Sequence, residues 1–168
     1  MNRGWVLVVG LSLAVVTGCG KVPEPTYSSE LVPAEGLVLF GSEPAADVDV
    51  VFTPEASNAA GSESHPAMGK TDSSGRFTML SPPGGEVKEI EKYTGVMPGD
   101  YVVTFHKFVM PDGSAFTAEM AKTSGPMAMG AKDIIPVQFT NPVTSPLKAK
   151  IPSGGNLTLE YKLPEIKK

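Results

Sequence analysis

The sequence predicts an all-β protein, an antiparallel β-sandwich of seven or so short strands. From residue 35 onward, short apolar runs alternate with polar residues, and turn-forming residues separate these runs at intervals of about 8–12 residues. The 18 glycines and 16 prolines of this 168-residue chain are ordinary for a turn-rich β domain and high for a helical protein. Because the chain has one cysteine, it has no internal disulfide framework, and packing alone must hold the core.

Four strands are expected in the first half of the domain, at residues 36–40, 48–53, 68–71 and 76–80. In the second of them, Val48, Val50 and Phe52 occupy alternate positions, which indicates one buried face. Between the third and the fourth, Asp72 and Gly75 stand at the first and last positions of a type I turn. This half therefore reads as a series of antiparallel hairpins.

The strongest strand pattern lies at residues 101–110, where Tyr101, Val103 and Phe105 share one face and His106 is expected to point outward. Two further strands follow, at 147–151 and 157–163. Three variable segments separate the strands, at 55–66, 82–97 and 112–132. We expect the second of these to be a loop or a short helix and the third, rich in Gly, Ala and Met, to be an insertion.

The N-terminus has the features of a secretion signal. Arg3 precedes an almost wholly apolar run at residues 5–16, which is shorter than the about 20 residues of a membrane-spanning helix. The small residues Thr17 and Gly18 supply a cleavage site, so residues 1–18 are expected to be removed. The mature chain then has 13 basic and 18 acidic residues, a formal charge of −5, which argues against a nucleic-acid partner.

The four residues Val16, Thr17, Gly18 and Cys19 resemble the lipobox of bacterial lipoproteins. The resemblance implies cleavage between Gly18 and Cys19, a diacylglyceryl thioether on the Cys19 sulfur, and a third, amide-linked acyl chain such as palmitate. Two or three acyl chains hold a protein stably on a membrane, at about 0.8 kcal/mol per buried methylene. The alternative is a plain signal peptide with an incidental cysteine, which a lone thiol in a secreted chain disfavours.

This resemblance places the chain in the cell envelope, lipid-anchored on the extracytoplasmic side of a membrane. Gly20 is not the Asp associated with inner-membrane retention, which favours the outer membrane. Residues 19–34 contain three prolines and no periodicity, so a lipidated cysteine followed by a semi-extended linker is expected there. The folded domain is expected at 35–164.

Two motifs resemble the signature of carboxypeptidase-regulatory-like domains, which have a T-D-x-x-G-x-F hairpin and a later P-G-x-Y-x-V strand start. They are TDSSGRF at 71–77 and PGDYVV at 98–103. The resemblance covers about residues 35–110 and implies a seven-stranded Ig-like or transthyretin-like sandwich. It also implies a module without catalysis, since the zinc and catalytic residues of carboxypeptidases belong to a separate domain. The tail at 135–147 is similar to that of small bacterial envelope lipoproteins with one such domain.

Few residues could carry chemistry. His65 and His106 lack the spacing of paired metal ligands, so both are expected to be ordinary surface histidines. With either of them, the methionines of the insertion would make a soft copper site, although methionines more often cover apolar surface. These are Met120, Met127 and Met129.

Two other patterns match catalytic or metal motifs in part. Ser145 and Lys148 fit S-x-x-K, but Pro146 disfavours the helix that this chemistry needs, and its partner motifs are missing. Asp72 and Ser74 fit the start of a calcium loop without its distal glutamate, and turn formation explains them better. We therefore expect no catalytic residue, no metal and no cofactor.

The expected function is that of a non-catalytic, lipid-anchored envelope protein with a structural or protein-binding role. Its contacts would be made by the loops at 55–66, 82–97 and 112–132, because loops on a rigid scaffold commonly carry binding. The alternative is a carbohydrate-binding module, for which Phe108, Phe116 and Phe139 are the aromatic residues outside the expected core. An enzyme would instead require His65, His106 and two or more carboxylates in one cleft.

Overall fold

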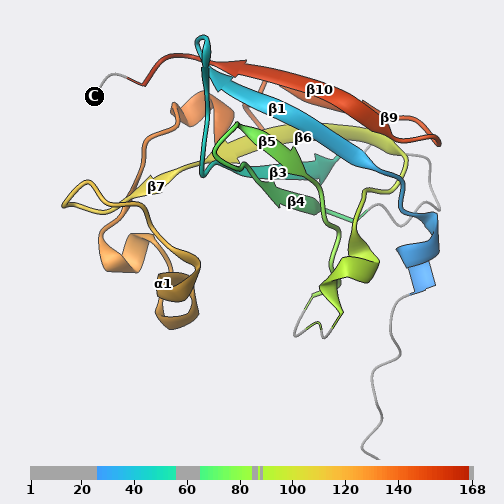
Figure 1. Cartoon of the computed structure of the whole chain (residues 1–168), viewed down its shortest axis with the longest axis horizontal. Helices are drawn as coiled ribbons and strands as arrows, with labels where there is room; N and C mark the ends of the chain where they lie inside the picture. Colours follow the sequence, from blue (N-terminus) through green and yellow to red (C-terminus); the bar gives the residue numbers. More distant parts are fainter. Residues whose placement is uncertain (1–25, 56–64, 85–86, 88, 167–168) are drawn as a thin grey trace, which may run out of the picture.

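The computed structural model describes residues 26–55, 65–84, 87 and 89–166, and over these residues the protein is an all-β sandwich, as predicted (Figure 1). The strands are β1 (Ala34–Phe40), β2 (Glu43–Pro44), β3 (Asp49–Pro54), β4 (Ala67–Lys70), β5 (Arg76–Thr78), β6 (Gly99–His106), β7 (Phe108–Val109), β8 (Lys132–Asp133), β9 (Lys148–Ile151) and β10 (Asn156–Leu163). The helical elements are α1 (Ala118–Thr123) and the 3-10 turns η1 (Thr26–Glu30), η2 (Ile90–Tyr93), η3 (Met127–Met129) and η4 (Val137–Phe139).

Two four-stranded sheets make up the sandwich. One has the order β10-β1-β2 with β5 also paired to β1, and the other has the order β4-β3-β6-β9. The pairing of β1 with β10 is parallel, with Val38 opposite Tyr161, so the expectation of a wholly antiparallel sandwich is wrong at this edge. The cause is the turn after β9, which carries the chain from one sheet to the other, where β10 joins the free side of β1.

The described residues contain more strands than the seven expected, because β2 and a two-stranded ribbon of β7 and β8 were not predicted. The strand expected at 101–110 ends at His106, since the backbone N–H of Lys107 donates to the carboxylate of Asp133 and the chain turns away to pair with β8. The insertion at 112–132 contains α1 and η3. It projects from the sandwich beside β7 (Figure 1).

The core lies between the two sheets and is rich in aromatic rings. Tyr101, Val103 and Phe105 are fully buried on one face of β6, as predicted, and burial raises the pKa of Tyr101 to about 12. Phe105 packs edge-to-face on Tyr161 of β10, with 5.3 Å between the ring centroids. The opposite face of β6 is also buried, since Val102 is 9% and Thr104 2% exposed. Ser145, in the segment after η4, donates its hydroxyl hydrogen bond to the carbonyl of Val103.

Residues 26–34, expected to belong to an extended linker, are packed against the domain. Tyr27 is 7% exposed, and its hydroxyl donates to the carbonyl of Ser81 at 2.9 Å. The ring packs in a small cluster with Tyr93 and Met97, apart from the main core. Backbone hydrogen bonds join Val32 to Val96 in both directions, and Ala34 is the first residue of β1. The three prolines and the lack of periodicity in residues 19–34 indicated a linker. The sequence did not predict this docking, because it depends on partners far along the chain.

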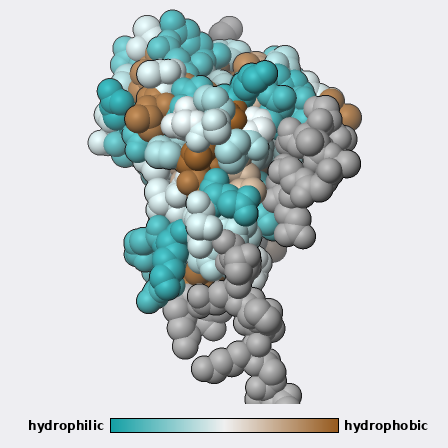
Figure 2. Space-filling view, turned by 90° about the vertical axis from the view of Figure 1, so that its right-hand side faces the viewer, coloured by the Kyte–Doolittle hydropathy of each residue, from teal (hydrophilic) through white to brown (hydrophobic). Residues whose placement is uncertain are grey.

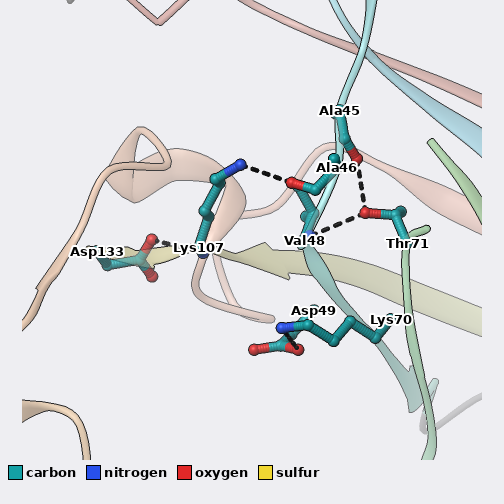
Figure 3. Close-up of polar contacts among 8 residues, drawn as sticks. All are labelled: Ala45, Ala46, Val48, Asp49, Lys70, Thr71, Lys107 and Asp133. Carbon is teal, nitrogen blue, oxygen red and sulfur yellow. Dashed lines mark hydrogen bonds and ion pairs between the residues drawn. The ribbon is translucent and has the colours of Figure 1, made fainter. Parts of the chain in front are cut away.

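The hydroxyl of Thr71 joins the start of β3 to the end of β4, and both of its bonds are drawn in Figure 3. It donates to the carbonyl of Ala45 at 2.6 Å and accepts from the N–H of Val48 at 2.8 Å. Thr71→Val keeps the side-chain shape but leaves two buried backbone groups without this partner. We expect the free energy of unfolding to fall by about 1–3 kcal/mol in urea denaturation followed by circular dichroism.

Thr78→Val is the matched control, since Thr78 is an exposed strand threonine. Equal unfolding midpoints for the two variants would contradict the bridging role of Thr71.

Candidate binding site

Cys19 and Gly18, the predicted sites of lipidation and cleavage, lie outside the described residues. The candidate site within the described residues is a cleft of about 420 Å³ between the sandwich and the insertion. One wall is charged and comes from β3, β4 and the residues just before β3; the other comes from the insertion and is mostly apolar. The lining residues are Asp47, Asp49, Lys70, Ala115, Phe116, Thr117, Ala118 and Ala121.

The charged wall is positioned by the pairing of β3 with β4. Asp49 lies opposite Lys70 in that register, and the Lys70 ammonium is 3.3 Å from the Asp49 carboxylate (Figure 3). Each side chain is about half exposed, so this pair adds at most about 1 kcal/mol to stability. Asp47 is exposed in a left-handed conformation with φ of 56°, and within the described ranges its carboxylate has no hydrogen bond or ion pair.

The apolar wall is connected to the sandwich by a series of side-chain contacts. The ring of Phe116 packs edge-to-face on Phe108, with centroids 6.4 Å apart, and Phe108 stacks on His106 at 5.9 Å. Nδ1 of His106 lies 2.7 Å from Oδ2 of Asp133 on β8. The same carboxylate accepts the N–H groups of Lys107 and Ile135. The base of the insertion is thereby fixed to the end of β6.

The expectation that His106 is an ordinary outward-pointing surface histidine is therefore wrong. Its side chain is 27% exposed and paired with Asp133, because the insertion returns through β8 and covers the end of β6. The sequence offered no local signal for this pair, since the two residues meet only through the β7–β8 ribbon.

Asp133→Ala is expected to loosen the insertion, because it removes the acceptor of two backbone N–H groups and the partner of His106. Loss of such bonds costs about 1–3 kcal/mol. Hydrogen exchange should show faster exchange of the amides at 108–132, while those of β3 and β6 keep their protection. Asp112→Ala is the control within the same insertion, since Asp112 accepts only from Ser114 in its own turn. Equal exchange in the two variants would contradict the role of Asp133 in fixing the base of the insertion.

The other candidate ligands do not come together in the structure. His65 stacks on Tyr27 at 4.0 Å, beyond the opposite end of the β3–β4 pair from His106. Its Nε2 is buried without a hydrogen-bond partner. Met127 is 75% exposed, so the expectation that the methionines of the insertion cover apolar surface is wrong for this residue. Within the described part of the chain, no group of three or more His, Cys, Asp or Glu could hold a metal ion.

The partial motifs have structural roles. Ser145 binds the backbone of β6, and Lys148 pairs with Glu55 at 2.5 Å. The hydroxyl of Ser74 and the N–H of Arg76 donate to Asp72, and these bonds hold the pKa of its carboxyl below the usual value. The contribution of this turn to stability is therefore present at neutral pH and lost as the pH falls through that lowered pKa.

The three aromatic candidates for glycan binding do not line one site together. Phe139 is 8% exposed and belongs to the core, so the expectation that it lies outside the core is wrong. Phe108 and Phe116 are both half-buried in the insertion and its ribbon, and of the two only Phe116 lines the cleft.

A second hollow, of about 570 Å³, lies at the same end of the sandwich as the insertion. Its lining includes Phe40, Ile134 and Ile166, with Lys107 placed over the ring of Phe40 at 5.9 Å. The Lys107 ammonium also donates to the carbonyl of Ala46 at 2.5 Å (Figure 3). This lysine therefore ties the two sheets together at the end of β6.

No protein-family model matches the sequence, and no curated protein matches it. Among solved structures, the chain is similar to a 9R-lipoxygenase from Cyanothece PCC8801, with 14% sequence identity and a TM-score of 0.33. The alignment covers 86% of this chain and 18% of the lipoxygenase, so the chain spans less than a fifth of that protein. A likeness at this TM-score carries no argument about function. None of the helices in the described ranges is long and apolar enough to span a membrane.

Proposed function

We propose that this chain is a lipid-anchored cell-envelope protein whose carboxypeptidase-regulatory-like sandwich has a structural or protein-binding role without catalysis. The observation that carries the proposal is the position of the one cysteine. Cys19 directly follows a signal-like apolar segment and precedes a packed β domain that begins a few residues later. A thiol in that place, in a chain without other cysteines, is well suited to receive lipid.

The cleft supports the binding part of the proposal. Of the three segments expected to make contacts, the one at 112–132 forms a wall of the cleft, while those at 55–66 and 82–97 lie partly outside the described residues. A protein surface with an apolar side chain next to a basic one would complement Phe116 on one wall and Asp47 on the other. Asp47 is exposed and makes no ion pair in the described structure, so its charge is available to such a partner.

Photocrosslinking in intact cells tests this role. A photoreactive amino acid is placed at Ala121 in the cleft and, as a control, at the exposed Glu160 on β10. We expect a protein adduct from position 121 that is absent at position 160. Adducts from neither position, or equally from both, would count against binding at the cleft.

Carbohydrate binding is the second candidate, favoured by the aromatic ring of Phe116 beside two carboxylates in one cleft. It predicts retention of the protein on purified envelope polysaccharide and loss of that retention in Phe116→Ala. If the polysaccharide retains wild type and Phe116→Ala equally, the cleft is not a glycan site.

A further inference from the structure

The lipid anchor and the fold together favour one end of the sandwich as the end near the membrane. Six residues lie between Cys19 and Thr26, where η1 begins, so a fully extended chain spans at most about 25 Å from one to the other. The linker expected to run to residue 34 would have allowed about twice that distance. Because Tyr27 and Val32 are docked, the domain is held on a short tether from one fixed point on its surface.

Three elements meet around that point, which we call the anchor end: η1, η2 and the turn between β9 and β10. The N–H of Asn156 donates to the carbonyl of Pro33 at 2.8 Å, and Tyr93 of η2 packs on Tyr27. In Figure 1, η1 and the turn between β9 and β10 lie at the right-hand end of the sandwich. Figure 2 looks onto that side and shows apolar residues interleaved with polar ones.

Two large apolar side chains are exposed at the anchor end. Ile90 on η2 is 44% exposed, and Leu157 at the start of β10 is 58% exposed. Beside Ile90, the side chains of Glu89 and Lys92 form an ion pair with each other. Mutual neutralisation of these charges favours apolar contact with a bilayer over attraction to anionic headgroups.

The opposite end of the sandwich is farther from the tether. β1 starts at the anchor end and runs for seven residues, a length of about 23 Å, to Phe40. Phe40 shares a hollow with Ile134, and η4 follows shortly after it. Val137 on η4 is 79% exposed, so it is an apolar surface residue at the end away from the tether.

We infer that the mature protein sits end-on at the lipid surface, with Ile90 and Leu157 inserted into the boundary between headgroups and acyl chains. The cleft beside the insertion then faces away from the membrane. This inference rests on the proposed lipid anchor, because without it the position of Thr26 says nothing about a bilayer.

Tryptophan fluorescence offers a direct test. The chain has one tryptophan, Trp5, within the segment expected to be removed. The mature protein is therefore expected to have no tryptophan fluorescence of its own. Ile90→Trp, Leu157→Trp and the control Val137→Trp each replace an exposed apolar residue. Each full-length chain is lipidated in cells, purified and reconstituted in vesicles of phosphatidylethanolamine and phosphatidylglycerol that carry brominated acyl chains.

We expect a blue shift and strong quenching at positions 90 and 157, unchanged at raised ionic strength, and little of either at position 137. Quenching at 137 equal to or stronger than at 90 and 157 would overturn the end-on arrangement. The mass of the mature N-terminal peptide distinguishes a failure of the end-on orientation from a failure of the proposed lipid anchor. An acylated Cys19 with equal quenching rejects only the orientation, whereas an unmodified Cys19 rejects the proposed function.

Discussion

Replacing Gly36 by alanine is expected to lower the free energy of unfolding by about 3 kcal/mol, the upper end of the usual cost of overpacking a core. A Cβ at this buried position would lie 2.4 Å from the carbonyl oxygen of Leu159 and 2.7 Å from Cζ of Phe77. Both distances are far below van der Waals contact. Urea denaturation followed by circular dichroism measures the loss.

The neighbours of Gly36 have no room to retreat. Leu159 and Phe77 belong to the strands that pair with β1 on its two sides, and the β1–β10 register shifts between Ala34 and Gly36. Moving the Leu159 carbonyl would break the parallel ladder, and moving Phe77 would disturb its edge-to-face packing on Phe52. The strain is therefore retained in the folded state rather than relieved.

Gly154→Ala is the matched control, because a Cβ there would meet nothing within 4 Å. We expect that variant to unfold at the wild-type midpoint. If Gly36→Ala unfolds at the same urea concentration as Gly154→Ala, the two strands adapt to a Cβ, and the close approach is not a constraint on the fold.

Local patterns predicted the strands well because alternation is a property of neighbouring residues. Residues 48–53 and 157–163 correspond to β3 and β10 to within a residue or two, and the Asp72 turn has the hydrogen bonds that its sequence indicates. Pairing partners are not local. The parallel contact of Val38 with Tyr161 joins the first long strand of the sandwich to the last, and alternation carries no information about that choice.

The candidate site shows the same limit more strongly. The loop at 112–132 was expected to make contacts, and it does form a wall of the cleft. The opposite wall depends on the β3–β4 register, which places Asp49 opposite Lys70. The attachment of the insertion to the end of β6 depends on the contact between Asp133 and His106. Tyr27 is similar, since its burial needs Tyr93 from another loop. Such pairs become visible only when the chain is folded.

Cys19→Ser is expected to abolish lipid attachment completely, the largest effect of any single substitution proposed for this chain. The hydroxyl of serine cannot form the thioether that carries the diacylglyceryl group, so the chain loses every acyl chain that depends on it. At about 0.8 kcal/mol per buried methylene, two or three acyl chains account for essentially all stable anchoring. Growth with radiolabelled palmitate measures the effect, and label in the protein band should vanish in Cys19→Ser.

Lys21→Ala is the control, because Lys21 lies two residues after Cys19 and its replacement leaves Cys19 in place. It should incorporate label like wild type. Equal incorporation in Cys19→Ser would show that the label is attached elsewhere and would sink the lipoprotein proposal.

The single cysteine allows an independent chemical test of the same modification. A thioether sulfur does not react with thiol reagents, so the denatured, mature wild-type protein should show no titratable thiol, even though the sequence contains a cysteine. If Cys19 were only an incidental residue after a plain signal peptide, the denatured mature chain would react with one equivalent of reagent or run as a disulfide-linked dimer. Either outcome would contradict lipidation at Cys19, and neither depends on how the domain folds or what it binds.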